Sequence, residues 1–271
     1  MNAHRAKVLR LDGLVGSIAA LTLLISLSGV ARAAVKDAPG AATGPRTVKA
    51  VLIHPWGGCG GVASGWDQLA QDWSTYGTTP LQIDSQTFCG PAQVTYAALV
   101  AAKADVLVLS DPAGAEYTFS SAEIAAITEY AQAGHNIVGT CLTFQYDSTV
   151  DQIDNTALAP LFGLTASFAG TSHTVTADYQ IRDSESLFRA VSNPYDSSGY
   201  PRTQSPSAGR WYLSALNGAK YGARTPGNHA AITIFRNNTY RYQAVYISTM
   251  PEFSPNTADE QFLYNALTLR R

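Results

Sequence analysis

Apolar and polar residues alternate in blocks along the chain, and these blocks predict strands separated by helices. Short runs rich in Val, Ile and Leu, typical of strands that are covered on both faces, occur at 48–56, 81–88, 105–111 and 136–144. Stretches with an apolar residue every three or four positions, typical of amphipathic helices, lie between them at 66–77, 91–104 and 119–134. Strands and helices that alternate through short loops favour right-handed crossovers, so we expect a parallel sheet.

Residues near the ends of these helices agree with the pattern. Ser120 and Glu123 have the spacing of a capping box, and Gly134 follows the last apolar position of the same helix. Pro91 is expected in the first turn of the helix before it, where its missing N–H costs no hydrogen bond.

The pattern loosens after residue 147, where Asp, Ser, Gly, Pro and Tyr dominate. Because this stretch lacks the periodicity of a second core, we expect an irregular insertion at about 168–229. Two apolar runs, 229–235 and 240–248, then predict a hairpin, and 257–269 predicts a closing amphipathic helix. The sequence therefore predicts an α/β domain with a flavodoxin-like, doubly wound, mostly parallel sheet and helices on both faces.

The first 33 residues have the composition of a signal peptide rather than of a folded domain. Basic residues precede an apolar run, and Ala31-Arg32-Ala33 supplies the small residues that a signal peptidase requires. We expect cleavage near Ala34 and export to the periplasm or the outside of the cell; a retained anchor is the competing interpretation. Residues 34–47 are then a flexible linker, and 48–271 form the single domain.

The charge balance excludes polyanionic partners. The chain has 18 Lys and Arg against 20 Asp and Glu, a net charge of −2 at pH 7, and removal of the basic leader makes it more acidic. We expect no nucleic-acid partner, and no membrane association after cleavage. With 46% hydrophobic residues, the remaining chain can bury a substantial core.

A glycine-rich stretch follows the first strand. Gly58, Gly60 and Ala63 fit the spacing of a dinucleotide-binding loop, but His54-Pro-Trp-Gly separates them from the strand. Since that fingerprint needs its first glycine directly at the strand end, we expect no nucleotide cofactor. Gly58 and Gly60 remain candidate binding residues at the mouth of a pocket.

Three cysteines, Cys59, Cys89 and Cys141, follow the predicted leader. An oxidising compartment and the neighbouring strand ends favour a disulfide between Cys59 and Cys89. No metal site is expected, because no two cysteines have the spacing of a zinc motif. Cys141 is then a free thiol, and free cysteines most often pack as small apolar residues in a buried strand.

At Cys141 the chain resembles a known family. IVGTCLTFQ is similar to the nucleophile-elbow segment of class I glutamine amidotransferases, which typically reads VLGICLGHQ, and AVYISTMPEF is similar to the segment of that family that ends in HPE. DVLVLSDPAG, FSSAEIAAITEYAQAGHNIVG and LAPLFGL resemble the ThuA-like, trehalose-utilisation-like branch. The resemblance covers roughly 48–165 and 230–268. It implies that Cys141 is the nucleophile and Glu252 the acidic residue of the triad.

The departures from that family concern the same site. Met250 stands where the family has its catalytic histidine, and a thioether cannot act as a general base. Thr143 replaces the second glycine of the elbow, which makes a tight turn harder to form. The sequence therefore predicts the loss of glutaminase activity, unless a displaced histidine takes over, and His54 at the end of the first strand is the best placed candidate.

Further candidates flank the cysteine. In the resembled family the loop that corresponds to Asp111–Gly114 supplies backbone donors to an oxyanion hole, and the amide of Leu142 would supply another. The alternative for that loop is a plain turn. Tyr200 and Trp211 lie in the insertion, where aromatic rings suit sugar faces but also anchor irregular segments to a core.

These observations favour an exported amidotransferase-like domain that binds or processes a small polar ligand, with a carbohydrate as the candidate class. Two alternatives stay open. One is a cysteine-dependent hydrolase or amidase that uses Cys141 with a displaced histidine. The other is a noncatalytic module that interacts with another protein or a polymer. Whether the chain is an enzyme is left open by the sequence.

Overall fold

A computed structural model describes residues 46–55, 64–89, 94–147, 152–166, 180–181, 186–197, 213–216, 218–224 and 230–270. The predicted signal peptide and nearly all of the linker lie outside these residues. The same holds for Gly58, Cys59, Gly60, Tyr200 and Trp211, so the predictions made for them stay predictions.

The core of the domain is an eight-stranded sheet with the order β2-β1-β3-β4-β12-β11-β10-β8. In that order the strands are Leu81–Phe88, Val48–Ile53, Val106–Ser110, Asn136–Thr140, Tyr242–Ile247, Ala230–Asn237, Lys220–Arg224 and Gln180–Ile181. The first five are parallel, and β11, β10 and β8 continue the sheet in antiparallel pairs. The flavodoxin-like, mostly parallel α/β sheet expected from the sequence is confirmed.

Two smaller antiparallel sheets accompany the main one. They pair β5 (Gln145–Asp147) with β6 (Gln152–Asp154), and β7 (Leu164–Ala166) with β9 (Leu213–Leu216).

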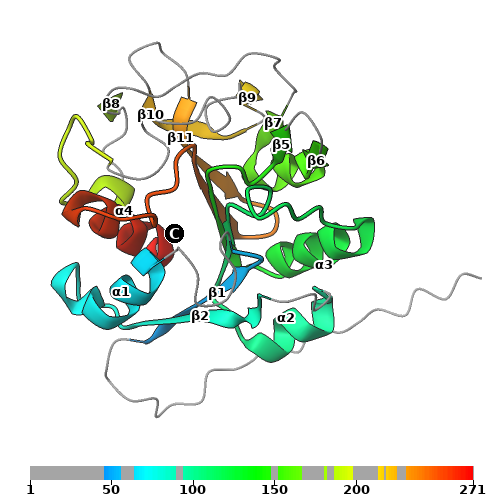
Figure 1. Cartoon of the computed structure of the whole chain (residues 1–271), viewed down its shortest axis with the longest axis horizontal. Coiled ribbons are helices and arrows are strands. Elements are labelled where there is room, and N and C mark those ends of the chain that lie inside the picture. The colour runs from blue at the N-terminus through cyan, green and yellow to red at the C-terminus, as the bar shows by residue number, and fades with distance from the viewer. Residues whose placement is uncertain are drawn as a thin grey trace, which may run out of the picture. The chain divides into compact units, whose positions relative to one another are not determined.

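Helices cover both faces of the main sheet, as Figure 1 shows. On one face lie α1 (Ser64–Asp72) and α4 (Thr257–Thr268), and on the other lie α2 (Tyr96–Ala102) and α3 (Ser121–Gln132). Among the described residues, short 3₁₀ segments form η1 (Trp73–Thr75), η2 (Thr156–Phe162) and η3 (Ser186–Phe188).

The alternation of side chains along each strand divides the core into two layers. In β1, Ala50 and Leu52 pack in the layer of α1 and α4, whereas Val51 and Ile53 pack in the layer of α2 and α3. Strand side chains point to opposite faces with period two, so a run that is apolar at every position fills both layers. This is why the continuous apolar runs predicted central strands correctly.

The ends of the helices follow the capping chemistry of the sequence. The capping box of Ser120 and Glu123 is formed as predicted. The helix predicted from residue 91 begins at Tyr96, and Pro91 itself lies outside the described residues. Its start is set by Thr95, whose side chain accepts a hydrogen bond from the amide of Ala98 at 3.2 Å.

Two further expectations need correction. The strand predicted over 136–144 ends at Thr140, so Cys141 follows the strand instead of lying inside it. The region interpreted as an irregular insertion contributes two strands, β10 and β8, to the main sheet. Lys220–Arg224 has Gly222 at its centre, and a short strand interrupted by glycine produces too weak an apolar alternation to be recognised in sequence.

No helix within the described ranges has the length and the apolar character needed to cross a membrane.

Candidate functional site

Three neighbouring parallel strands each end in a residue with left-handed backbone geometry. His54 follows β1 with φ 45°, Asp111 follows β3 with φ 52°, and Cys141 follows β4 with φ 48°. Non-glycine residues rarely adopt positive φ, and each one costs on the order of 1 kcal/mol or more. Strained residues of this kind cluster at functional sites, and in this fold ligands bind at the carboxyl ends of the strands.

Cys141 is held by its backbone and enclosed by apolar side chains. Its amide donates to the carbonyls of Ile247 and Thr249, both at 2.9 Å, and its carbonyl accepts from the hydroxyl of Tyr246 at 2.8 Å. The residue is 2% exposed and shares an apolar cluster with Ala113, Leu142, Ile153 and Met250. Met250 thus packs in the same cluster as the sulfur, at the position where the resembled family has its base.

The carboxyl group of Asp111 occupies the donors that were expected to form an oxyanion hole. Its Oδ1 accepts from the amide of Leu142 at 3.1 Å and from the amide of Gly114 at 3.2 Å. A methyl group added at Gly114 would lie 2.4 Å from Asp111 Oδ2, so the loop closes tightly around this carboxyl. A substrate oxyanion would have to displace Asp111 from both amides.

The electrostatic environment opposes a thiolate. Burial raises the pKa of the Cys141 thiol well above its usual value, and the nearby charges of Asp111 and Glu252 raise it further. Burial, and then the charge of Glu252, also raise the pKa of Asp111 well above its usual value. These three groups therefore favour their neutral forms together.

The chain after Cys141 does not supply the helix amino terminus that lowers a thiol pKa in nucleophile elbows. Residues 141–144 bend, and Gln145–Asp147 is strand β5. The hydroxyl of Thr143 donates to the carbonyl of Thr140 at 2.8 Å, which closes the bend. The threonine at the glycine position is therefore accommodated by a different turn, without the helix.

Glu252 is fully buried and is held by hydroxyl groups from two strand ends. Its Oε1 accepts from Ser110 Oγ at 2.5 Å and from Thr140 Oγ1 at 2.6 Å. Trp66 Nε1 in turn donates to Ser110 Oγ at 3.0 Å. Oε2 has no hydrogen-bond partner in the described part of the chain. Burial outweighs the two hydroxyl groups and raises the pKa of Glu252 to about 7.

His54 has a different environment. Its ring stacks on Tyr117 with a centroid distance of 3.4 Å and meets Phe119 edge-on, and Tyr117 donates to Glu123 at 2.7 Å. Burial lowers the pKa of His54, which the charge of Glu123 partly offsets. The groups that act on the Cys141 thiol are Asp111, Glu252 and the Leu142 amide. A catalytic role for His54, Cys141 or Glu252 remains a prediction.

Sequence reasoning missed three residues of this site, Trp66, Ser110 and Thr140. A hydroxyl residue at the last position of β3 and of β4 is the signal that was available, because apolar strands seldom end in pairs of buried hydroxyl groups without a shared acceptor.

Cys141 is free and buried, and the partner proposed for Cys89 lies outside the described residues, so the disulfide stays a prediction. Tyr195, one of the aromatic residues of the insertion, is fully buried and donates to Asp259 at 2.6 Å, so it anchors its segment. Within the described ranges, no three His, Cys, Asp or Glu residues lie in an arrangement that could hold a metal ion.

No protein-family model matches the sequence, and neither does any curated protein. Solved structures do resemble the chain. The N-terminal domain of mmIFT52 aligns with a TM-score of 0.55 and 12% identity, over 83% of this chain and 98% of that domain. A ThuA-like protein from Bacteroides uniformis aligns with a TM-score of 0.49 and 12% identity, over 84% of this chain and 92% of that one. A glutamine amidotransferase from Methylobacillus flagellatus aligns with a TM-score of 0.43 and 10% identity, over 77% and 71%.

The alignment with the mmIFT52 domain shows a likeness of overall fold. The resemblance to class I amidotransferases and to their ThuA-like branch rests on the sequence segments around Cys141 and Glu252. At identities of 10 to 12% the likeness concerns the fold alone. What the site does must therefore be argued from its own residues.

Proposed function

We propose that the chain is an exported, noncatalytic amidotransferase-like domain that binds a small polar ligand at the carboxyl ends of its parallel strands, with a carbohydrate as the ligand class. Export rests on the sequence of residues 1–33. The two parts of the proposal that concern the site, the absence of cysteine catalysis and the binding of a ligand, rest on separate observations.

The observation that carries the noncatalytic assignment is the position of Asp111. Acyl transfer from a cysteine requires a thiolate and free donors for the oxyanion. Here one carboxyl group accepts from both candidate donor amides and also accepts a hydrogen bond from the Cys141 thiol. The same side chain therefore holds the sulfur in its protonated form and fills the place of the oxyanion.

Ligand binding is supported by what lies beside the cysteine. His54 Nε2 is buried and has no hydrogen-bond partner in the described part of the chain. Its neighbour Tyr117 is only partly buried, and the glycine-rich stretch that begins at residue 57 follows directly. An unsatisfied buried nitrogen is costly unless a ligand or water completes it, and a tyrosine ring suits the apolar face of a sugar.

The first test is the reactivity of Cys141. We expect iodoacetamide to label Cys141 in the folded chain at least about 100-fold more slowly than in urea at pH 8, because burial and the two neighbouring carboxyl groups suppress the thiolate. Labelling is followed by mass spectrometry of the peptide that contains Cys141. Rapid labelling of the folded chain at pH 6 would reveal an activated thiolate and support the hydrolase alternative.

The second test is ligand binding. We expect at least one member of a panel of glucose, trehalose, N-acetylglucosamine and glutamine to raise the melting temperature, with the gain lost in Tyr117→Ala because that ring covers His54. Tyr240→Ala is the matched control, since Tyr240 is 42% exposed on the hairpin far along the sheet from β1. A flat response to the whole panel would contradict small-ligand binding and favour the interaction module.

A further inference from the structure

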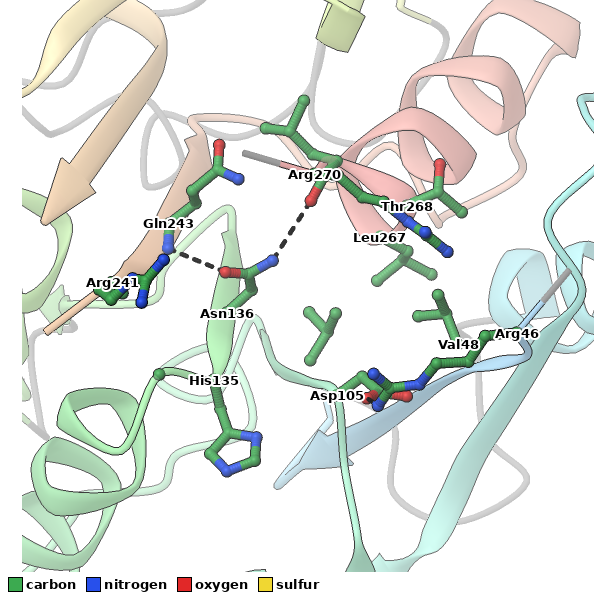
Figure 2. Close-up of a pocket in the computed structure, with 13 residues that line it drawn as sticks. Arg46, Val48, Asp105, His135, Asn136, Arg241, Gln243, Leu267, Thr268 and Arg270 are labelled. Atoms are coloured by element: carbon green, nitrogen blue, oxygen red, sulfur yellow. Dashed lines mark hydrogen bonds and ion pairs between the residues drawn. The ribbon is translucent and has the colours of Figure 1, made fainter. Parts of the chain in front are cut away.

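A cavity of about 410 Å³ lies at the amino ends of the parallel strands, opposite the strand ends that carry Cys141. Val48, Val106 and Asn136, the first residues of β1, β3 and β4, line it together with the last turn of α4. Figure 2 shows this cavity with its polar side chains. A volume of this size suits a small molecule. None of the residues discussed for the cysteine site belongs to it.

The lining of this cavity is cationic in a chain that is acidic as a whole. Arg46, Arg241 and Arg270 line it against one carboxylate, Asp105. Arg46 forms an ion pair with Asp105. In the described part of the chain no ion pair engages Arg241 or Arg270. Two exposed arginines that line the cavity are therefore without an ion-pair partner among the described residues.

His135 also lines the cavity, and its environment disfavours the charged imidazole. His135 stacks on Tyr130 at a centroid distance of 3.9 Å, and burial lowers its pKa more than the Ala104 backbone and the charge of Asp105 raise it. The lowered pKa favours the neutral imidazole, so the arginines and Asp105 dominate the charge of the lining.

Asn136 and Gln243, which line the cavity, are held in place by hydrogen bonds to the protein. Asn136 Nδ2 donates to the carbonyl of Leu269 at 3.3 Å, and Asn136 Oδ1 accepts from the amide of Gln243 at 2.9 Å. The side-chain carbonyl of Gln243 accepts from Arg236 at 3.2 Å. These bonds join β4, β12 and the end of α4, and Gln243 itself lines the cavity.

Arg241 is placed by a strained backbone. It lies in the β11–β12 hairpin with φ 63°, and its amide donates to the carbonyl of Asn237 at 2.8 Å. Glycine or asparagine is the usual residue in such a position. The backbone at Arg241 therefore does not require an arginine, and asparagine can take its place.

Helix dipoles oppose an anion at this edge but are too weak to exclude one. The carboxyl ends of α3 and α4 lie here and carry roughly half a negative charge each, screened and confined to the last turn. The two guanidinium groups carry two full charges and offer forked donors that match carboxylate and phosphate oxygens. The full charges outweigh the partial ones.

We propose that this cavity binds a small anion with at least two negative charges, either a polycarboxylate or a phosphoryl compound, through Arg241 and Arg270. The site is independent of the function proposed for the carboxyl ends of the strands. Figure 2 draws Arg241 and Arg270 together with Asn136 among the residues that line this cavity.

The test is calorimetric titration of the full chain with inorganic phosphate and with citrate, at constant ionic strength set by sodium chloride. We expect saturable binding of at least one of the two, weakened about 10-fold or more in Arg241→Asn and in Arg270→Gln. Arg241→Asn should also fold at least as stably as the wild-type chain, because asparagine tolerates positive φ. Loss of binding without loss of stability therefore separates a ligand role from a structural one.

Arg189→Gln, which removes an exposed arginine outside the cavity, is the matched control and should bind like the wild-type chain. The two arms distinguish the ligand classes, since a carboxylate site prefers citrate and a phosphoryl site prefers phosphate. The proposal is overturned if neither anion binds saturably, or if both arginine variants bind as the control does. In that case the arginines only neutralise the helix ends.

Discussion

Glu252→Gln is expected to unfold with a free energy about 3 kcal/mol higher than the wild-type chain at pH 8, and with an equal free energy near pH 4. Glu252 is fully buried, and its pKa is raised from 4.5 to about 7 because burial disfavours the charged form. Glutamine reproduces the shape of the neutral acid and can accept from Ser110 and Thr140 as glutamate does.

The direction of this pH dependence follows from the protonation of Glu252 in the folded and the unfolded chain. Below pH 4.5 Glu252 is protonated in both states, so the substitution has no effect on stability. Between pH 4.5 and 7 the unfolded chain releases the proton while the folded chain keeps it, so wild-type stability falls by about 1.4 kcal/mol per pH unit. Above pH 7 the wild-type chain has lost all of this stability. Glu252→Gln has no such loss, because its amide does not titrate.

Urea denaturation at pH 4, 6 and 8 measures this difference. Glu129→Gln, on the exposed face of α3, is the matched control and should leave the pH profile of stability unchanged. Parallel profiles for the wild-type chain and Glu252→Gln would show that Glu252 does not titrate as a buried acid.

Asp259→Ala is expected to lower the free energy of unfolding by about 3 to 5 kcal/mol and the melting temperature by roughly 10 °C. Asp259 Oδ1 accepts from Tyr195 and Ser197, both at 2.6 Å, and Oδ2 accepts from the amide of Asn256 at 3.1 Å. Alanine would leave two buried hydroxyl groups without this acceptor and would break the capping box of α4.

Asp259→Asn is the graded comparison. Its side-chain oxygen can still accept from Tyr195 and Ser197, and it loses only the bond from Asn256, so we expect a loss of about 1 kcal/mol. Thermal melts of the wild-type chain, Asp259→Asn and Asp259→Ala should give melting temperatures that fall in that order. An alanine variant that melts with the asparagine variant would mean that Tyr195 and Ser197 find other acceptors.

The same anchor shows why the insertion was hard to interpret from sequence. Tyr195 and Ser197 reach α4 some 60 positions further along the chain, and β10 pairs with β11 although its own residues barely alternate. Both features depend on contacts between distant segments, which local periodicity does not record. The central strands were predictable because a strand that is buried on both faces requires a continuous run of apolar residues.

The candidate site likewise has features that could be found in the sequence and features that only the structure revealed. The resemblance around Cys141 and the replacement of the family histidine by Met250 could be found in the sequence, because each is a property of one short segment. The approach of the Asp111 carboxyl to the Leu142 amide could not, since it joins the ends of two strands through two left-handed residues. The spacing of Asp111 and Gly114 indicated only a turn or a donor loop.

By itself, then, the amino-acid sequence determined the order of strands and helices, the parallel centre of the sheet and the segment in which the cysteine lies. These depend on apolar periodicity and local capping, which act over a few residues. Only the tertiary structure decided that a carboxyl group fills the expected oxyanion donors, and that Arg46, Arg241 and Arg270 line one cavity. Both outcomes arise when segments far apart in the chain meet, and the charge and burial at their meeting point set the chemistry.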